Sequence, residues 1–304
     1  MAGRDVVIGG TGFTGKYITK CLLKYKHKVV ALTKHVNRDN EFGRKITIKP
    51  LDFENQENLV ETMNGSRCVF NTYWVRFNYG GSSFDEAVRN SKAIIDACVD
   101  AKVKRLVHIS VLDPSKNYKY DYFRAKMEVE SYIEKSGLSY AILRPALLFG
   151  EEDILMNNIT YLIRKYGLFF IFGSGEYKVT PTYVGDVAKE AVLQSRLNKN
   201  IIEDALGPEA FGFEELVRYI ATTIGRPTRV AHLNKAFIPL VSKFLNICMH
   251  EPVVTSDEMG LLMDNGLYSD SKPIGSIRFS KWLKERKDTY GTEYHSETKR
   301  HFTK

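Results

Sequence analysis

Tyr122 and Lys126 place a phenol and an amine four residues apart in the chain. On a helix this spacing puts both side chains on one face. A nearby ammonium favours the phenolate and draws a tyrosine pKa of about 10 toward neutrality, so the phenol could exchange a proton with a substrate. The same spacing recurs at Tyr161–Lys165 and Tyr268–Lys272. The pattern therefore has to be judged by the elements that carry it.

Position separates the three pairs. Tyr122 opens an expected helix that follows an expected strand ending in Ser110. Ligands of open α/β sheets bind beyond the carboxyl ends of the strands, which is where Ser110 and Tyr122 fall. Tyr161 lies beyond the next strand and Tyr268 lies in the C-terminal region, so the sequence favours Tyr122 with Lys126 as the proton-transfer pair.

A second group suited to ligand binding is the glycine-rich start of the chain. A β-branched run breaks into Gly9, Gly12 and Gly15, and a helical pattern follows at once. Strand, tight turn and helix are the context of a dinucleotide-binding fingerprint. The three glycines would allow the turn, the approach of backbone to a pyrophosphate, and close helix–strand packing. The predicted cofactor contacts here are Gly9, Thr11, Gly12, Phe13, Thr14, Gly15 and Lys16.

Two other interpretations of the glycines were weighed. The overlapping GxxxxGK resembles a nucleoside-triphosphate loop, but Tyr17 stands where that loop needs a Ser or Thr hydroxyl. A purely structural glycine turn is the other alternative. The helix that follows the turn would offer free N–H groups to phosphates, which favours the dinucleotide.

The end of the second strand bears on which dinucleotide binds. An acidic residue there would bond a ribose 2′-hydroxyl, whereas a cation would accommodate a 2′-phosphate. The strand ends in a basic run with no carboxylate before Asp39, so NADP(H) is favoured over NAD(H). The alternative is that these cations form a solvated loop. The further predicted cofactor residues are Thr33, Lys34, His35, Arg38, Asn71, Thr72 and Asp52, the last of which could equally cap the following helix.

Strand and helix patterns alternate through the first two-thirds of the chain. After the first strand, strands are expected at 28–32, 46–51, 67–71, 105–110 and 140–144, and helices at 55–63, 85–101, 122–136 and 154–166. This alternation predicts an α/β fold with a doubly wound parallel (Rossmann) sheet. The expected domains are residues 1–195, with 150–178 contributing to a cap, and a smaller, mostly helical region at 196–304.

Composition excludes some classes of function. The net charge of +8 suits anionic ligands, but no basic run interleaved with aromatic residues indicates nucleic acid. The cysteines match no disulfide or zinc spacing and are expected as buried thiols in a reducing compartment: Cys21, Cys68, Cys98 and Cys248. No metal site is expected. The most apolar segment, 236–249, is too short to span a bilayer and is expected as a core helix, with an interfacial helix as the minor alternative. The expected location is cytoplasmic.

Several motifs together resemble one family. They are GGTGFTGKY at the start, Asn90, LVHIS ending at Ser110, YFRAK at 122–126, LRPALLFGEED at 143–153 and PTYVGDVA at 181–188. On these the chain is similar to short-chain dehydrogenase/reductase proteins of the extended or atypical type. Among them it resembles the prokaryotic relatives of the nucleotide-binding accessory subunit of mitochondrial complex I.

The resemblance implies roles for the matching positions. Tyr122 would be the acid/base and Lys126 would hold the nicotinamide ribose. Ser110 would hydrogen-bond the reacting oxygen, and Asn90 could support a proton-relay water. The residues implied to line the nicotinamide are Pro145, Ala146, Leu147 and Leu148.

The chain departs from the family at two points. Val111 replaces a second serine, and the fourth strand runs into an aromatic and basic loop that contains Trp74 and Arg76. We interpret Trp74 as a wall and Arg76 as an anion clamp of a substrate pocket, with a merely packed loop as the alternative. These departures disfavour sugar-nucleotide chemistry. The hypothesis is an NADP(H)-dependent oxidoreductase or epimerase-type enzyme acting on a small molecule; the alternative is a non-catalytic NADPH-binding protein associated with a membrane complex, and an oligomer is compatible with both.

Overall fold

The computed structural model describes residues 3–78, 81–249 and 255–298, without the side chains of residues 244, 245 and 247–249. The chain forms two compact units. The first comprises residues 1–145 and 184–205, and the second comprises residues 146–183 and 206–304. Each unit is described by itself below.

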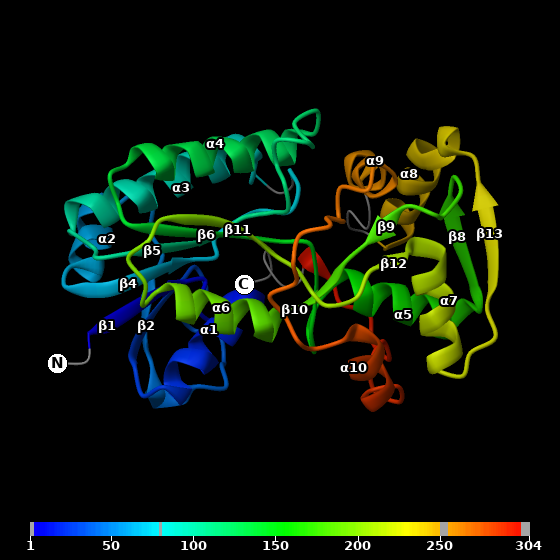
Figure 1. Cartoon of the computed structure of the whole chain (residues 1–304), viewed down its shortest axis with the longest axis horizontal. Helices are drawn as coiled ribbons and strands as arrows, with labels where there is room; N and C mark the ends of the chain where they lie inside the picture. The colour runs from blue at the N-terminus through cyan, green and yellow to red at the C-terminus, as the bar shows by residue number, and fades with distance from the viewer. Residues whose placement is uncertain (1–2, 79–80, 250–254, 299–304) are drawn as a thin grey trace. The chain divides into compact units, whose positions relative to one another are not determined.

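The first unit contains a seven-stranded parallel sheet in the order β11-β6-β5-β4-β1-β2-β3 (Figure 1). The strands are β1 (Arg4–Ile8), β2 (Lys28–Thr33), β3 (Thr47–Pro50), β4 (Ser66–Asn71), β5 (Leu106–Ile109), β6 (Tyr140–Pro145) and β11 (Ile201–Ala205). The order reverses between β1 and β4, and a ligand of such a sheet binds at that reversal. The predicted α/β fold with a doubly wound parallel sheet is confirmed.

Helices cover both faces of this sheet. They are α1 (Phe13–Lys24), α2 (Gln56–Met63), α3 (Phe84–Asp100), α4 (Asp121–Lys135) and α6 (Val184–Gln194). Figure 1 shows α2, α3 and α4 on one face, with α1 and α6 together on the other. The face under α3 and α4 matters for the site, because Tyr122 and Lys126 belong to α4.

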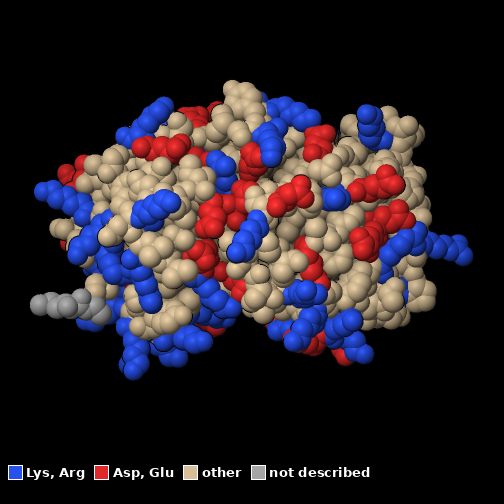
Figure 2. All heavy atoms as spheres, in the orientation of Figure 1, with Lys and Arg blue, Asp and Glu red and all other residues tan. Residues whose placement is uncertain are grey.

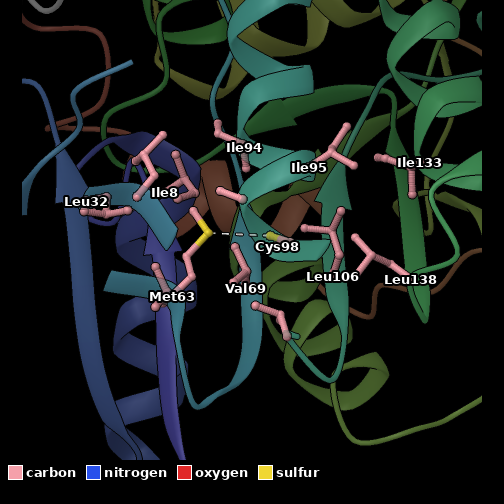
Figure 3. Packing of buried hydrophobic residues seen from close by; sticks show 14 of the residues in the cluster. Ile8, Leu32, Met63, Val69, Ile94, Ile95, Cys98, Leu106, Ile133 and Leu138 are labelled. Carbon is pink, nitrogen blue, oxygen red and sulfur yellow. Dashed lines mark hydrogen bonds between the residues drawn. The ribbon is translucent and has the colours of Figure 1, made fainter. Parts of the chain in front are cut away.

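The core of the first unit lies between the sheet and the helices α2, α3 and α4 (Figure 3). Ile94, Ile95 and Cys98 point from α3 onto Val69 of β4 and Leu106 of β5, and all five are fully buried. Apolar residues at i, i+1 and i+4 of α3 form the stripe that a helix buries against a sheet. This packing holds α3 against β4 and β5, and α4 lies beside α3.

Charged side chains are spread over the visible face in Figure 2, with tan and red atoms between the blue ones. Lysine and arginine atoms are densest where Figure 1 places α1 and β2. The glycine turn lies at the start of α1, and the basic run predicted to meet an anionic ligand follows the end of β2.

The second unit has three two-stranded sheets and five α-helices within its described residues. The strands are β7 (Leu147–Phe149), β8 (Leu168–Phe172), β9 (Lys178–Val179), β10 (Pro181–Tyr183), β12 (Phe211–Gly212) and β13 (Arg229–Leu233). The helices are α5 (Leu155–Tyr166), α7 (Phe213–Thr223), α8 (Ile238–Met249), α9 (Ser256–Met263) and α10 (Phe279–Glu285). Phe149, Phe279 and Trp282 centre its own aromatic core.

The division of the chain differs from the expected boundary at residue 195. Strand β11 was not anticipated, yet it pairs in parallel with β6 and completes the sheet, so the first unit continues to residue 205. Residues 146–183 belong wholly to the second unit. The C-terminal region is also less helical than expected, because β13 pairs with β8.

Two local expectations can be compared with the structure. Cys68 and Cys98 are buried thiols and Cys21 is half-buried, without a disulfide at any of the three, while the side chain of Cys248 lies outside the described residues. Helix α8 is not wholly a core helix, since Leu240 is 65% exposed. Across the described residues, every helix falls short of the length and apolar character needed to cross a membrane.

Candidate functional site

The glycine turn joins β1 to α1. Gly9 has φ of +71°, a conformation that suits glycine, and the amide of Gly12 donates to the carbonyl of Gly9 at 2.8 Å. Gly12 is the N-cap of α1, and no side chain caps that end. The first N–H groups of a helix have no partner within the helix, so they can bind an anion. The turn therefore has the geometry of a phosphate cradle.

Gly15 is the position in the turn that tolerates least change. A Cβ added there would lie 2.1 Å from the carbonyl oxygen of Gly9. This oxygen belongs to the backbone, so it cannot move aside by a side-chain rotation. We predict that Gly15→Ala lowers the free energy of unfolding by about 1–3 kcal/mol and weakens dinucleotide binding at least about tenfold. Urea denaturation and NADPH titration measure the two effects. Gly43→Ala is the control for dinucleotide binding: no atom lies within 4 Å of its added Cβ, so only its left-handed φ of +52° carries a cost in stability and the NADPH affinity should not change. An equal loss of NADPH affinity in the two variants would contradict the assignment.

Cations gather beyond the end of β2. Lys34 is exposed, and its ammonium lies 5.5 Å from the centroid of the Phe53 ring and 6.0 Å from that of Tyr73. The amide of His35 donates to the hydroxyl of Thr33, which turns the chain at the strand end. Arg38 is exposed a few residues further along. Lys34 thus stands over two aromatic rings at the carboxyl edge of the sheet.

A carboxylate absent from the sequence argument also reaches this region. Glu41 pairs with Lys16 at 3.8 Å and with Lys20 at 2.9 Å. Lys16, one of the predicted cofactor contacts, therefore has a carboxylate of its own chain beside it. No sequence signal identified Glu41, because it follows the strand end by eight residues and meets α1 only in the folded chain. Asp52 accepts a bond from the Glu54 amide, whereas Asn55 caps α2, so the capping alternative for Asp52 is wrong.

Residues at the reversal point tie β4 to β1. The hydroxyl of Thr72 donates to the carbonyl of Ile8 at 2.7 Å, and Asn71 accepts from the amide of Tyr73. The hydroxyl of Thr19, which the sequence argument missed, donates to the carbonyl of Gly10 at 2.9 Å. Thr72 and Thr19 thus brace the glycine turn from two sides.

Tyr122 lies in the first turn of α4 among aromatic rings. Its ring meets those of Trp74 and Phe84 edge to face, with centroids 5.9 Å and 5.7 Å apart. Lys126, one turn later, places its ammonium 4.1 Å from the centroid of the Trp74 ring. Trp74 therefore contacts both members of the Tyr–Lys pair. The sequence predicts Trp74 as a wall of a substrate pocket. The contact of Trp74 with Lys126 is evident only in the structure.

Lys126 is buried, with 2% of its surface exposed. Its ammonium donates to the carbonyl of Ile109 at 3.2 Å. Burial lowers the pKa of Lys126 from 10.5 to about 7, because the charged form loses its water, and the carboxylate of Glu130 opposes this shift. Such an amine exchanges its proton in the neutral range, which is the range in which an acid/base partner of Tyr122 is useful.

Ser110 directly follows Ile109, the residue whose carbonyl binds Lys126. Its amide donates to the carbonyl of Leu143, and its hydroxyl is buried with no hydrogen-bond partner among the described residues. A buried hydroxyl without a partner is costly and is common at ligand sites. Ser110 and Lys126 therefore meet at the end of β5.

His108 precedes Ile109 in β5 and belongs to the buried part of the first unit. The ring is fully buried, but neither nitrogen has a partner among the described residues. Burial, and then the charge of Lys126, hold the pKa of His108 well below its usual value. Asn71 is opposite His108 in the register of β4 and β5, and its side-chain amide nitrogen is also buried without a partner. Buried polar groups thus line the sheet edge beside Lys126.

Asn90, for which the resemblance implies a proton-relay water, contacts the loop after β4. Its amide nitrogen donates to the hydroxyl of Tyr73 at 2.9 Å. Burial raises the pKa of Tyr73, so the phenol stays protonated. Through this bond to Tyr73, Asn90 stabilises the loop after β4.

The remaining candidates are distributed over both units. Arg76 is half-buried, with its guanidinium 5.6 Å from the centroid of the Phe77 ring. Pro145 ends β6 in the first unit, and its carbonyl accepts from the Leu112 amide. Ala146, Leu147 and Leu148 belong to the second unit. In the described part of the chain, no group of three or more His, Cys, Asp or Glu side chains could hold a metal ion.

The residues at the reversal point fit a dinucleotide. The turn leaves the approach to the α1 N-terminus free of side-chain caps, as a pyrophosphate requires. The buried hydroxyl of Ser110 and the buried amide of Asn71 lack partners at the same sheet edge. This arrangement is that of a dinucleotide-binding protein.

Comparison with known proteins agrees with the geometry. A family model described as NAD(P)H-binding matches residues 9–161, half of the chain, so the chain belongs to this family. Over 222 residues it is 25% identical to subunit 9 of the NADH dehydrogenase (ubiquinone) 1 alpha subcomplex of Arabidopsis thaliana mitochondria, covering 69% of this chain and 55% of that protein. Over 228 residues it is 25% identical to the Arabidopsis 3β-hydroxysteroid dehydrogenase/decarboxylase isoform 2, and the match covers 63% of this chain and 40% of that protein.

The fold has solved counterparts. The triphenylmethane reductase of a Citrobacter species superposes with a TM-score of 0.77 at 16% identity, covering 93% of this chain and 99% of that one. At this identity the likeness concerns the fold alone. The chain spans 55% and 40% of the lengths of the two Arabidopsis relatives.

Proposed function

We propose that this protein is an NADP(H)-dependent oxidoreductase in which Tyr122 exchanges a proton with a substrate oxygen. NADP(H), when bound, supplies or accepts the hydride. In the reducing direction the Tyr122 hydroxyl gives its proton to the carbonyl oxygen as the hydride reaches the carbonyl carbon, and the product is an alcohol. Ser110 donates a hydrogen bond to the same oxygen, and Lys126 steadies the dinucleotide and lowers the pKa of Tyr122.

The observation that carries this proposal is the grouping of Tyr122, Lys126 and Ser110 at one edge of the sheet. Lys126 binds the carbonyl that precedes Ser110 and shares the Trp74 ring with Tyr122. Burial lowers the pKa of Lys126 to about 7, and perturbed pKa values of this kind cluster at functional sites. A dehydrogenase among the similar proteins supports a redox reaction.

The test is turnover by the full chain. Purified protein is given NADPH deuterated at its transferable position together with a panel of aldehydes, ketones and quinones. We expect NADPH oxidation above background with at least one class of compound, and deuterium on the carbonyl carbon of an aldehyde or ketone product. Binding of NADPH without transfer to any compound of the panel would count against the enzyme.

The preference for NADP(H) rests on Lys34, with Arg38 nearby. We predict that Lys34→Asp weakens NADPH binding about 10–100-fold, because a charge-assisted hydrogen bond to the 2′-phosphate is lost and a repulsion replaces it. NADH has no such phosphate, so its affinity should change less than about threefold. Titrations with both nucleotides measure the ratio.

The control for this charge reversal is Lys24→Asp, at the last residue of α1, away from the turn. It changes the net charge by the same amount and should weaken both nucleotides equally and slightly. Equal weakening of NADPH and NADH by Lys34→Asp would refute the assignment of Lys34 to the 2′-phosphate.

A second candidate function is non-catalytic NADPH binding in a protein that associates with a membrane complex. The similarity to a named subunit of mitochondrial NADH dehydrogenase favours it. Under this alternative NADPH would raise the melting temperature of the protein, and Tyr122→Phe would leave both this shift and every cellular phenotype unchanged. Loss of turnover in the same variant would favour the enzyme instead.

A further inference from the structure

The contact between Trp74 and Lys126 is the feature of the site that neither the spacing of the motif nor the similar proteins account for. The ammonium lies 4.1 Å from the ring centroid, close enough for a strong cation–π interaction. The indole nitrogen of Trp74 is buried and has no hydrogen-bond partner among the described residues. The position of the ring is therefore not set by a hydrogen bond of the indole N–H. It is set by the contact of the ring face with Lys126 and by the edge-to-face contact with Tyr122.

We propose that Trp74 is a positioning residue for Lys126, whose indole face holds the ammonium against the Ile109 carbonyl and so prepares it for the dinucleotide. This inference rests on the proposed function, because it takes Lys126 as the group that meets the nicotinamide ribose. An ammonium has three N–H donors. The Ile109 carbonyl takes one and the indole face takes a second, which leaves one for a ribose hydroxyl.

The groups around Lys126 show why an aromatic partner is needed. His108 of β5 is neutral because burial lowers its pKa. Glu130, on α4 with Tyr122, is the carboxylate whose charge acts on Lys126, and it accepts hydrogen bonds from the guanidinium of Arg144 on β6. On α3, Lys92 is paired with Glu128.

A buried ammonium is costly unless it is compensated. The Ile109 carbonyl and the carboxylate of Glu130 offset part of this cost, and the ring of Trp74 adds negative potential at 4.1 Å from the ammonium. The indole therefore stabilises the charged form of Lys126 and fixes its place.

Tryptophan fluorescence tests this contact directly. The chain has two tryptophans, Trp74 and Trp282, so Trp282→Phe leaves Trp74 as the only indole. We expect its emission to change in a single titration with a midpoint near pH 7, as Lys126 loses its proton. Lys126→Met in the same background should abolish the titration.

The matched control is Lys165→Met, since Lys165 has the same spacing to Tyr161 and also contacts a tyrosine ring but belongs to the second unit. It should leave the Trp74 titration intact. Emission that stays constant across this pH range, or a titration that survives Lys126→Met, would overturn the inference. Neither result depends on turnover or on a cofactor, so the oxidoreductase proposal would stand or fall separately.

Binding of NADP⁺ supplies the second readout. Trp74→Leu removes the aromatic face and should weaken NADP⁺ binding about 3–10-fold near pH 7, the range of a partly desolvated cation–π contact. Trp74→Phe keeps a weaker face and should recover most of the affinity. The loss in Trp74→Leu should grow between about pH 6 and pH 8, because Lys126 then gives up its proton at lower pH. A loss of equal size at every pH, with no recovery in Trp74→Phe, would show a packing defect and contradict the positioning role.

Discussion

Tyr122→Phe should lower kcat/KM about 10²–10⁴-fold while NADPH binding stays within about twofold of wild type. The hydroxyl is the group that gives its proton to the substrate oxygen, and general acid/base catalysis contributes an effect of this size. The phenylalanine ring keeps the contacts with Trp74 and Phe84, so the fold and the dinucleotide site should persist. Steady-state rates and NADPH titration on the same preparation separate the two effects.

Tyr161→Phe is the control, because Tyr161 belongs to a second Tyr–Lys pair of the same spacing and its hydroxyl accepts from Lys165. Its removal should leave turnover unchanged. If Tyr122→Phe turned over substrate as fast as wild type, Tyr122 would not be the acid, and only the dinucleotide-binding part of the proposal would survive.

Lys126→Met should make the protein more stable near neutral pH and less able to bind NADPH. The amine is buried and its pKa falls from 10.5 to about 7, so the fold carries the cost of a desolvated charge. Methionine fills a similar volume without that charge. We expect the free energy of unfolding to rise by about 1–3 kcal/mol at about pH 6, after allowing for the unpaired Ile109 carbonyl.

The pH dependence gives this prediction its sign. Below about pH 7 Lys126 is charged in the folded and the unfolded chain, and burial of the charge lowers the free energy of unfolding. Between pH 7 and 10.5 the unfolded chain holds the proton more tightly, so the free energy of unfolding rises with pH, by on the order of 3–5 kcal/mol from this group.

Urea denaturation at several pH values measures this slope. Lys126→Met should remove it, whereas Lys165→Met, which changes an exposed lysine, should keep it. A Lys126→Met protein that is less stable than wild type at about pH 6 would mean that the buried amine stabilises the fold, contrary to its lowered pKa.

The alternation of apolar runs predicted most of the sheet, because strands of a doubly wound sheet are nearly all apolar and their helices carry regular stripes. Five of the later strands fall within one or two residues of their expected ranges. β11 was missed since Ile201–Ala205 contains Glu203 and Asp204 and sits at the sheet edge, where the apolar signal is weak. The pair of β8 and β13 joins segments too far apart in the chain for a local pattern to reveal.

For the site, the sequence by itself predicted the glycine turn and favoured Tyr122 among three equal spacings, because both depend on neighbours within one strand–turn–helix unit. Only the tertiary structure decided what Lys126 meets. Trp74 comes from the loop after β4 and Ile109 from β5, and both contact Lys126 of α4, which packs against α3 and β6. Such contacts depend on the position and angle at which a helix crosses a sheet. The spacing of residues along the chain does not specify either of them.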